Sequence, residues 1–274
     1  MTSNVEKQEE LRKEIERLSN EIEDEFYVDY EGFRYKGKLF FLDFEFLKKY
    51  EYKIMGCIIE NGKIYRLEIC DDEAIEIYES GDLVDLDVKE LLIEDSDIEG
   101  LSWTKLPKGL KELILLWCDS FKYCDISGLE NLERLSIRGD YVLDKVYWKN
   151  EDGKELFPKS IKMLTFRECV FLDDYDLSGL ENLEVVVFNR CGIENLDYRK
   201  LPRSIRLIDV SDCSYLREYD LSKLDNLEEV HLAATKIRKL EANKLPKSLK
   251  IIHVLGFVDI SDVKEKMPWV DIKV

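Results

Sequence analysis

Two histidines are the residues of this chain best placed to bind a metal ion, and they are its only histidines. His231 and His253 are 22 residues apart, and Asp209 lies the same distance before His231. Imidazole and carboxylate groups are common ligands of Zn²⁺ and related ions. A metal site formed by these three residues is one interpretation. The other, which we favour, is a surface column on a binding face, and we therefore expect no metal and no cofactor.

Seven cysteines are the next candidates for chemistry. They are odd in number and include no paired C-x-x-C motif, which indicates reduced thiols in a cytoplasmic or nuclear protein. Pairing of Cys213 with a histidine as a nucleophile is disfavoured, because its place in the pattern described below directs its side chain into a turn. The sequence also lacks a glycine-rich phosphate loop, a G-x-S-x-G motif and an H-E-x-x-H motif. We therefore expect a protein that is not an enzyme.

A repeat of 22 residues determines where these side chains lie. From Leu183 to Ser248, three rows read LEVVVFNRCGIENLDYRKLPRS, IRLIDVSDCSYLREYDLSKLDN and LEEVHLAATKIRKLEANKLPKS. Apolar residues occupy positions one, four and six of each row, and a small polar residue or a cysteine occupies position nine. In a short strand, positions four and six point inward and positions three, five and seven point outward. One row cannot bury its apolar face alone, so we expect parallel strands stacked row on row around a continuous core.

The same frame extends over eight rows. They begin at Val88, Leu110, Leu132, Ile161, Leu183, Ile205, Leu227 and Leu249. Every step is 22 residues except the one from Leu132 to Ile161, which is 29. The longer step contains the polar stretch WKNEDGKE, from Trp148 to Glu155. We interpret it as a surface loop that leaves the stacked strands undisturbed.

The rows also alternate in pairs, so that the full unit is about 44 residues long. Rows that end in Leu-Pro-x-Ser or a close variant alternate with rows that end in Leu-Glu-Asn or Leu-Asp-Asn. Position two alternates between basic and acidic residues: Lys111, Glu133, Lys162, Glu184, Arg206, Glu228 and Lys250. Parallel neighbours lie ~4.8 Å apart. This column is therefore predicted to form a charge ladder that opposes a slip by one row.

The L-x-x-L-x-L-x-x-(N/C) core at this period resembles the leucine-rich repeat superfamily. The alternating LPxSLKxL and GLENLExL rows are similar to those of intracellular members, and the resemblance covers residues 88–260. It implies an α/β solenoid, a horseshoe with a parallel β-sheet on its concave face and an irregular or short helical convex side. It also implies protein–protein recognition by a non-catalytic scaffold.

The segments outside the repeats are predicted to cover the ends of the solenoid. Residues 1–26 indicate a charged helix, which caps the repeats or, alternatively, mediates self-association. Residues 27–87 indicate an aromatic-rich β cap with a hairpin at Asn61-Gly62, a short strand at Ala74–Glu79 and a degenerate first row. An independent β-rich binding domain is the alternative for this segment. Residues 261–274 indicate a C-terminal cap with a last strand between Trp269 and Val274.

The outward positions define a candidate partner-binding face. Its predicted residues are Trp117, Arg134, Arg138, Arg167, Arg190, Asp209, His231 and His253. Tryptophan and arginine are frequent anchors in protein interfaces, so we expect a groove centred on Trp117, Arg138, Arg167 and Arg190. The alternative is that the arginines neutralise nearby carboxylates such as Glu168.

A net charge of −18 limits the class of partner. Nucleic acid and anionic membranes attract basic surfaces, so neither is expected as the main partner. A basic protein partner fits the charge, although the charge also favours solubility alone. We expect an interaction scaffold or adaptor. The alternatives are an acidic inhibitor of a basic enzyme and the substrate-recognition subunit of a ubiquitin ligase, although residues 26–60 lack the Leu-Pro-x-x-(Leu/Ile) opening of an F-box.

Overall fold

The computed structural model of the chain describes residues 25–28, 33–36, 41–50, 53–60, 63–118, 123–139 and 145–274. Most of the charged helix expected over residues 1–26 lies outside these ranges, and so does the predicted Asn61-Gly62 turn. The last two residues of that helix were wrongly predicted, because strand β1 already begins at Glu25. It runs over Glu25–Val28 and pairs antiparallel with β2, Phe33–Lys36.

One sheet of eleven strands organises the molecule, in the order β19-β18-β17-β15-β13-β11-β9-β7-β5-β4-β3. Only β3 and β4 pair antiparallel within it; all other neighbours are parallel. The strands are β3 Ile54–Glu60, β4 Lys63–Cys70, β5 Glu90–Glu94, β7 Glu112–Leu116, β9 Arg134–Arg138, β11 Met163–Arg167, β13 Val185–Asn189, β15 Leu207–Asp209, β17 Glu229–His231, β18 Ile251–His253 and β19 Asp271–Lys273.

Neighbouring strands pair in the register that the rows predict. Leu113 lies opposite Leu135, which lies opposite Leu164 across the longer step. Leu164 in turn lies opposite Val186. These inward side chains are all buried, while the outward residues of β7 are partly exposed. The predicted α/β solenoid is confirmed by this stack of parallel strands around one continuous core.

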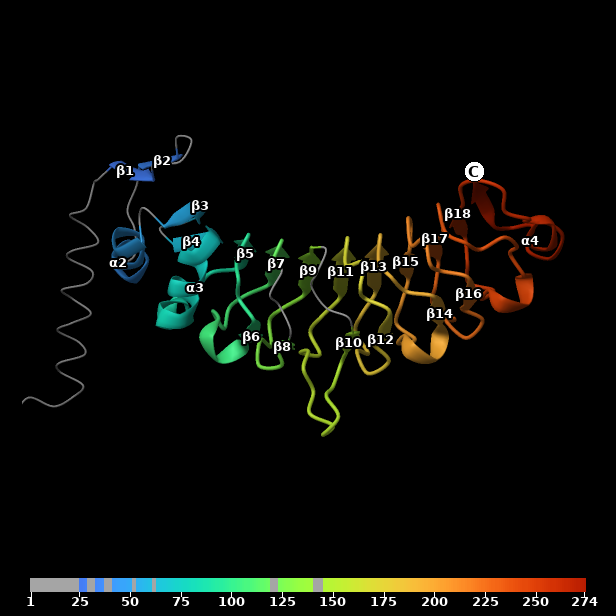
Figure 1. Cartoon of the computed structure of the whole chain (residues 1–274), viewed down its shortest axis with the longest axis horizontal. Helices are drawn as coiled ribbons and strands as arrows, with labels where there is room; N and C mark the ends of the chain where they lie inside the picture. Colours follow the sequence, from blue (N-terminus) through green and yellow to red (C-terminus); the bar gives the residue numbers. More distant parts are fainter. Residues whose placement is uncertain are drawn as a thin grey trace, which may run out of the picture.

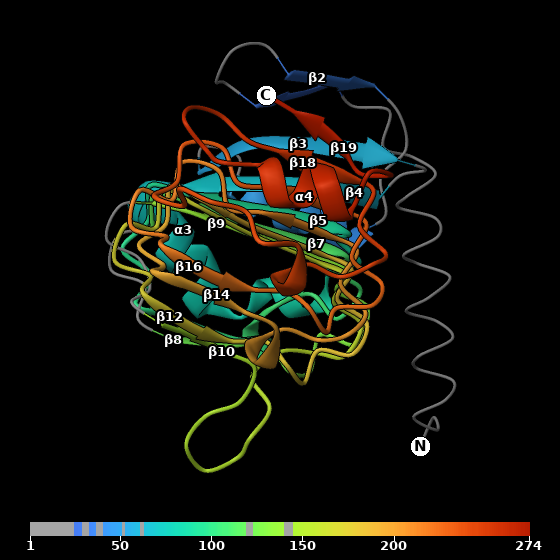
Figure 2. The ribbon, with the colours of Figure 1, turned by 90° about the vertical axis from the view of Figure 1, so that its right-hand side faces the viewer.

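The solenoid is elongated and gently curved (Figure 1). Its strands lie lower in the middle of the array than at either end, so the large sheet forms the concave face. The view along the axis shows a second layer of short strands opposite this sheet (Figure 2). These convex strands are β6 Gly100–Ser102, β8 Tyr123–Asp125, β10 Lys145–Tyr147, β12 Asp174–Asp176, β14 Asn195–Asp197 and β16 Glu218–Asp220. The 3₁₀ turns are η1 Asp82–Asp85, η2 Trp103–Lys105, η3 Tyr198–Lys200 and η4 Ala242–Lys244.

The convex side repeats every two rows. Its strands form separate parallel pairs, β6 with β8, β10 with β12 and β14 with β16. Between pairs, a tyrosine hydroxyl accepts a backbone N–H from the next row: Tyr78 from Ser102, Tyr175 from Asp197 and Tyr219 from Glu241. The two-row unit of the sequence is therefore a structural unit as well.

The predicted strand at Ala74–Glu79 is wrong. These residues belong to helix α3, Asp71–Ser80, which buries Ala74, Ile77 and Tyr78. Burial at positions i, i+3 and i+4 is the helical spacing. Three acidic residues in the first turn and a left-handed Gly81 after the last turn favour the helix at both ends. The alternating apolar residues suggested a strand because short runs fit both periods.

Two further helices were not predicted from the sequence. Helix α2, Phe41–Tyr50, buries Phe46, Leu47 and Tyr50 against the N-terminal end of the core. Helix α4, Ser261–Lys266, lies at the opposite end and buries Val263. It leads to β19, the strand expected between Trp269 and Val274, which pairs with β18.

The long step forms the predicted surface loop. Lys149 and Glu155 form an isolated antiparallel bridge, and residues 151–154 between them are exposed. The loop projects from the convex side next to β10 (Figure 1). The strands on either side of the step, β9 and β11, pair directly.

Candidate protein-binding face

The middle of the concave sheet carries four apolar side chains and one threonine. Met163, Val185 and Leu207 occupy position three of consecutive rows, and Thr165 and Val187 occupy position five. The register places Met163 opposite Val185, and Val185 opposite Leu207. The three residues at position three are partly exposed, whereas Thr165 and Val187 are buried by their neighbours. We call these five residues the central patch.

Most rows have a residue in left-handed backbone at position eight, after the strand. The non-glycine examples are Asp71, Asp95, Trp117, Glu168, Arg190, Asp212 and Ala234, with φ between 46° and 62°. Left-handed backbone is uncommon outside glycine, asparagine and aspartate. At these residues the chain turns out of the sheet, always at the same edge. Trp117, Glu168 and Arg190 lie along this edge, which we call the rim.

Glu168 joins two of the predicted arginines at this rim. Arg138 Nε donates to Glu168 Oε2 at 2.7 Å, and Arg190 Nη1 donates to Glu168 Oε1 at 2.9 Å. The Arg138 guanidinium carbon also lies 4.8 Å from the centroid of the Trp117 ring, which is a cation–π distance. Arg138, followed by Arg190, lowers the pKa of Glu168 and keeps it ionised. This geometry matches the alternative interpretation, in which the arginines neutralise a carboxylate.

Arg134 and Arg167 differ from these two arginines. Arg134 lies at position three and pairs with Glu112 at 2.7 Å, and its Nη2 is 4.0 Å from Glu90. Arg167 is exposed at position seven, and its side chain makes no ion pair or hydrogen bond with any residue that the structure describes. Of the predicted arginines, Arg167 is therefore the one best placed to receive a carboxylate from another molecule.

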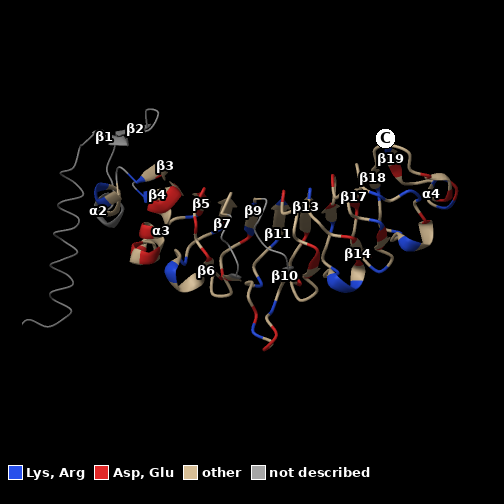
Figure 3. Cartoon of the chain, viewed as in Figure 1, with Lys and Arg blue, Asp and Glu red and all other residues tan. Residues whose placement is uncertain are grey.

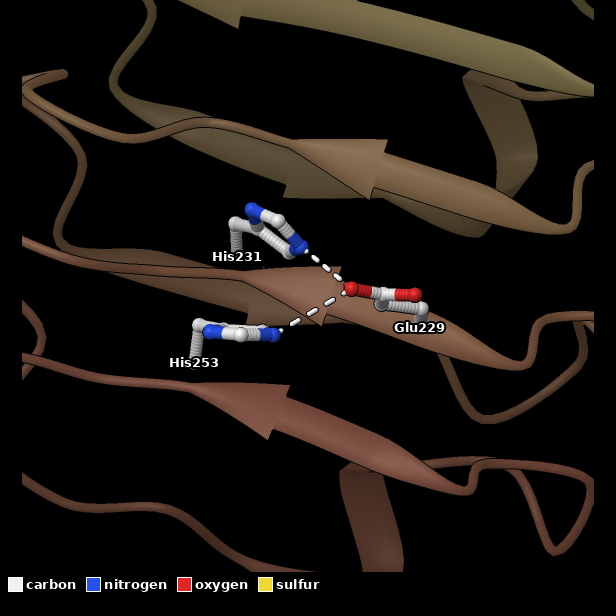
Figure 4. Close-up of side chains that lie close together, drawn as sticks. All are labelled: Glu229, His231 and His253. Atoms are coloured by element: carbon white, nitrogen blue, oxygen red, sulfur yellow. Dashed lines mark hydrogen bonds and ion pairs between the residues drawn. The ribbon is translucent and has the colours of Figure 1, made fainter. Parts of the chain in front are cut away.

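The two histidines lie side by side on β17 and β18. Their ring centroids are 4.1 Å apart, and the register pairs the two residues directly. Glu229 Oε1 is 2.6 Å from His231 Nε2 and 3.2 Å from His253 Nε2. Figure 4 shows both rings facing this one carboxylate oxygen. Asp209 Oδ2 is 3.9 Å from His231 Nδ1, on the other ring nitrogen.

The eight predicted residues therefore form several groups on the sheet. Trp117, Arg138 and Arg190 gather around Glu168, and His231 and His253 gather around Glu229. Sequence reasoning did not assign Glu229 to this group, although it lies two residues before His231 on the same face of one strand. That spacing is the signal that identifies it.

Acidic and basic residues are distributed unevenly along the solenoid. Figure 3 shows acidic residues gathered on α3 and short basic segments on the convex turns. The basic segments include Lys105 of η2, Arg199 and Lys200 of η3, and Lys244 of η4. The concave arginines are thus separated from the basic convex turns by the thickness of the core.

The cysteines of the repeat are structural. All seven lie in the described part of the chain, and no disulfide joins them. Cys213 Sγ donates to the carbonyl of Phe188 in the preceding row at 2.8 Å. Burial raises the pKa of Cys191 and raises that of Cys213 to about 12. Such thiols are poor nucleophiles.

Comparisons with known proteins find likeness among solved structures. No protein-family model and no curated protein matches the chain. Among solved structures, the chain is similar to CroV588, described as a circular leucine-rich repeat protein, with a TM-score of 0.42 and 14% identity. The match covers 62% of this chain and 27% of that one, so the chain spans about a quarter of that protein's length.

The sheet itself defines the fold class as an α/β solenoid with a large, mostly parallel sheet. None of the helices in the described ranges combines the length and the apolar character needed to cross a membrane.

Proposed function

We propose that this protein is a non-catalytic interaction scaffold that binds a partner protein on its concave sheet. The observation that carries the proposal is the central patch with Arg167 beside it. Apolar side chains at the middle of a sheet, next to a guanidinium without a carboxylate partner among the described residues, offer both elements of an interface core. Interface energy concentrates in such apolar and arginine anchors.

The partner that fits this face has two chemical features. An apolar segment would cover Met163, Val185 and Leu207, and a carboxylate would pair with Arg167. The net charge of −18 favours encounter with a protein that is basic overall. A basic protein with a local acidic and apolar contact segment satisfies both conditions.

A comparative capture experiment tests the proposal. Wild type, Arg167→Glu and Val185→Arg are immobilised and exposed to lysate of the source organism, and bound proteins are identified by mass spectrometry. Arg203→Glu is the matched control, because Arg203 is an exposed arginine in the turn before β15 and lies outside the strands. All four proteins are first shown to have the same melting temperature within experimental error.

The proposal expects the same partner on wild type and on Arg203→Glu. It expects at least a tenfold loss of that partner on Arg167→Glu and Val185→Arg, corresponding to about 1.4 kcal/mol. Equal capture by all four proteins would reject the concave sheet as the binding face.

A further inference from the structure

We propose that Glu229, His231 and His253 form a binding site for a divalent transition-metal ion of the Zn²⁺ class. The proposal goes beyond the scaffold function and does not depend on it. It rests on three donor groups of two neighbouring strands, β17 and β18, that converge on one point of the concave sheet (Figure 4).

The repeat fixes the directions of the three side chains. Glu229 and His231 occupy positions three and five of β17, so both project from the outward face. His253 occupies position five of β18, and the parallel register places it next to His231. The donor atoms lie within 4.8 Å of one another. A rigid sheet thus brings the three groups together.

The donor set is the kind that Zn²⁺ accepts. Two imidazole nitrogens and one carboxylate oxygen bind Zn²⁺ at about 2.0–2.2 Å and leave a further position open. Tetrahedral ligands at these distances are about 3.3 Å apart. The distance from His253 Nε2 to Glu229 Oε1 is already 3.2 Å. The distance from His231 Nε2 to Glu229 Oε1 is 2.6 Å. Rotation of the partly exposed Glu229 side chain would increase this distance to the one that the metal requires.

The surroundings favour a cation. Asp209 lies 3.9 Å from His231 Nδ1, and a carboxylate on the far side of an imidazole supports the tautomer whose Nε2 binds metal. The nearest basic residue along the column is Lys273, opposite His253, and its ammonium is paired with Asp271 at 2.6 Å. The three ligand side chains are 27–37% exposed. An ion can therefore enter from solvent, and its open position faces the concave side.

The sequence contains an internal reporter for this site. His231 and His253 are the only histidines, so the imidazole C–H signals in a proton NMR spectrum of the tag-free chain come from these two residues. The metal-free protein is titrated with ZnCl₂ at pH 7.5, by calorimetry and by NMR. Co²⁺ is then substituted, because its absorption spectrum distinguishes nitrogen and oxygen ligands from cysteine thiolates.

Three variants test the assignment of ligands. His253→Ala and Glu229→Gln each remove one ligand, and Glu112→Gln is the matched control at position three of β7 on the same face. Circular dichroism and melting temperature verify that each variant is folded. If His253→Ala fails to fold, Glu229→Gln decides the question, because it preserves the size of the side chain.

The proposal expects one ion per chain, a shift of both histidine signals, and a cobalt spectrum without thiolate bands. Each ligand variant is expected to weaken binding by more than about tenfold, since losing even an outer partner of a metal ligand typically costs 10–100-fold. Glu112→Gln should bind like wild type. Absence of Zn²⁺ binding to wild type at millimolar concentration, a thiolate spectrum, or unchanged affinity in both ligand variants would overturn the proposal.

Discussion

At the scale of single residues, the end of each strand depends on backbone in the left-handed region. Seven non-glycine residues adopt it at position eight, and glycine occurs there in two other rows, at Gly139 and Gly256. Gly256 has φ of 94° and lies well inside that region. Left-handed backbone costs other residues about 1–2 kcal/mol. The repeat therefore contains local backbone strain at the position where the chain leaves the sheet in the same way from row to row.

Ala234 offers a direct test of this strain. It is exposed and has φ of 54°, so Ala234→Gly should stabilise the protein by about 0.5–1 kcal/mol, the left-handed strain outweighing the extra chain entropy of glycine. Its neighbour Ala233, which has no positive φ, is the matched control, and Ala233→Gly should destabilise by a similar amount. Urea unfolding measures both. Destabilisation by Ala234→Gly would contradict the account.

The Glu168 cluster predicts a pH-dependent stability difference. Because the folded protein lowers the pKa of Glu168, its ionised form stabilises the fold above the ordinary carboxyl pKa of 4.5. That contribution is lost as pH falls through the lowered value. Glu168→Gln should therefore destabilise by about 1 kcal/mol at pH 7 and much less at pH 3.

Urea unfolding of wild type and Glu168→Gln at the two pH values measures this difference. Glu181→Gln is the control, since Glu181 is exposed and makes no side-chain bond with a described residue. A difference for Glu168→Gln that is independent of pH would contradict the proposed role of its charge.

At the scale of elements, the alternating row ends form a continuous hydrogen-bond ladder. The serine of each Pro-x-Ser ending donates to the backbone carbonyl of the first residue of its own row. The amide of each asparagine ending donates to a backbone carbonyl of the preceding row. The donors and acceptors are Asn131 to Lys108, Ser160 to Leu132, Asn182 to Lys159, Ser204 to Leu183, Asn226 to Arg203 and Ser248 to Leu227. The alternating serine and asparagine side chains thus provide hydrogen-bond donors for backbone carbonyls near the start of each strand.

Removal of one bond in this ladder should be measurable. Ser204 Oγ donates to the carbonyl of Leu183 at 2.7 Å, and Leu183 is fully buried. Ser204→Ala should destabilise by about 1–2 kcal/mol, because a buried carbonyl loses its donor. Ser214→Ala, at an exposed serine of the next row, should change stability by less than about 0.5 kcal/mol. Equal effects of the two substitutions in thermal unfolding would argue against the ladder.

The position-two charge ladder is formed in part. Lys162 lies 3.1 Å from Glu133, and Glu228 pairs with both Arg206 and Lys250 at 3.1 and 2.7 Å. All of these side chains are substantially exposed, so each pair contributes only about 0–1 kcal/mol. Selection of the register remains their predicted effect.

The strands of the large sheet could be predicted from sequence, whereas the helices outside the repeats could not. The repeat spacing predicts both where a strand lies and which strand pairs with it. The predicted stack of Leu113, Leu135 and Leu164 is therefore observed. Helix α3 lies outside the repeat, so the spacing of other rows gives no information about it. Its ten residues fit the apolar pattern of a strand or of a helix, and packing against the core determines which one forms. In the site, the Glu168 pairs and the contacts of Glu229 depend on side-chain rotamers. The position of these residues in the repeat predicts the face of the sheet on which they lie, but it does not predict which side chains they contact.

At the scale of the whole molecule, the two faces of the solenoid have different roles. The convex side has paired short strands and tyrosine bridges that follow the two-row unit. The concave side keeps a regular backbone but varies its outward side chains, from acidic at β5 through apolar at β13 to histidine at β18. Stability in such repeats depends on contacts between neighbouring rows. The outward concave residues are therefore free to differ, as a binding face requires.

Site-specific photo-crosslinking tests the central claim most directly. A benzophenone amino acid is placed in separate variants at Val185 or Leu207, on the concave sheet, and at Asp152, in the convex loop. After irradiation with the captured partner, the account predicts covalent adducts from positions 185 and 207 and none from position 152. Adducts formed from position 152 alone would contradict it.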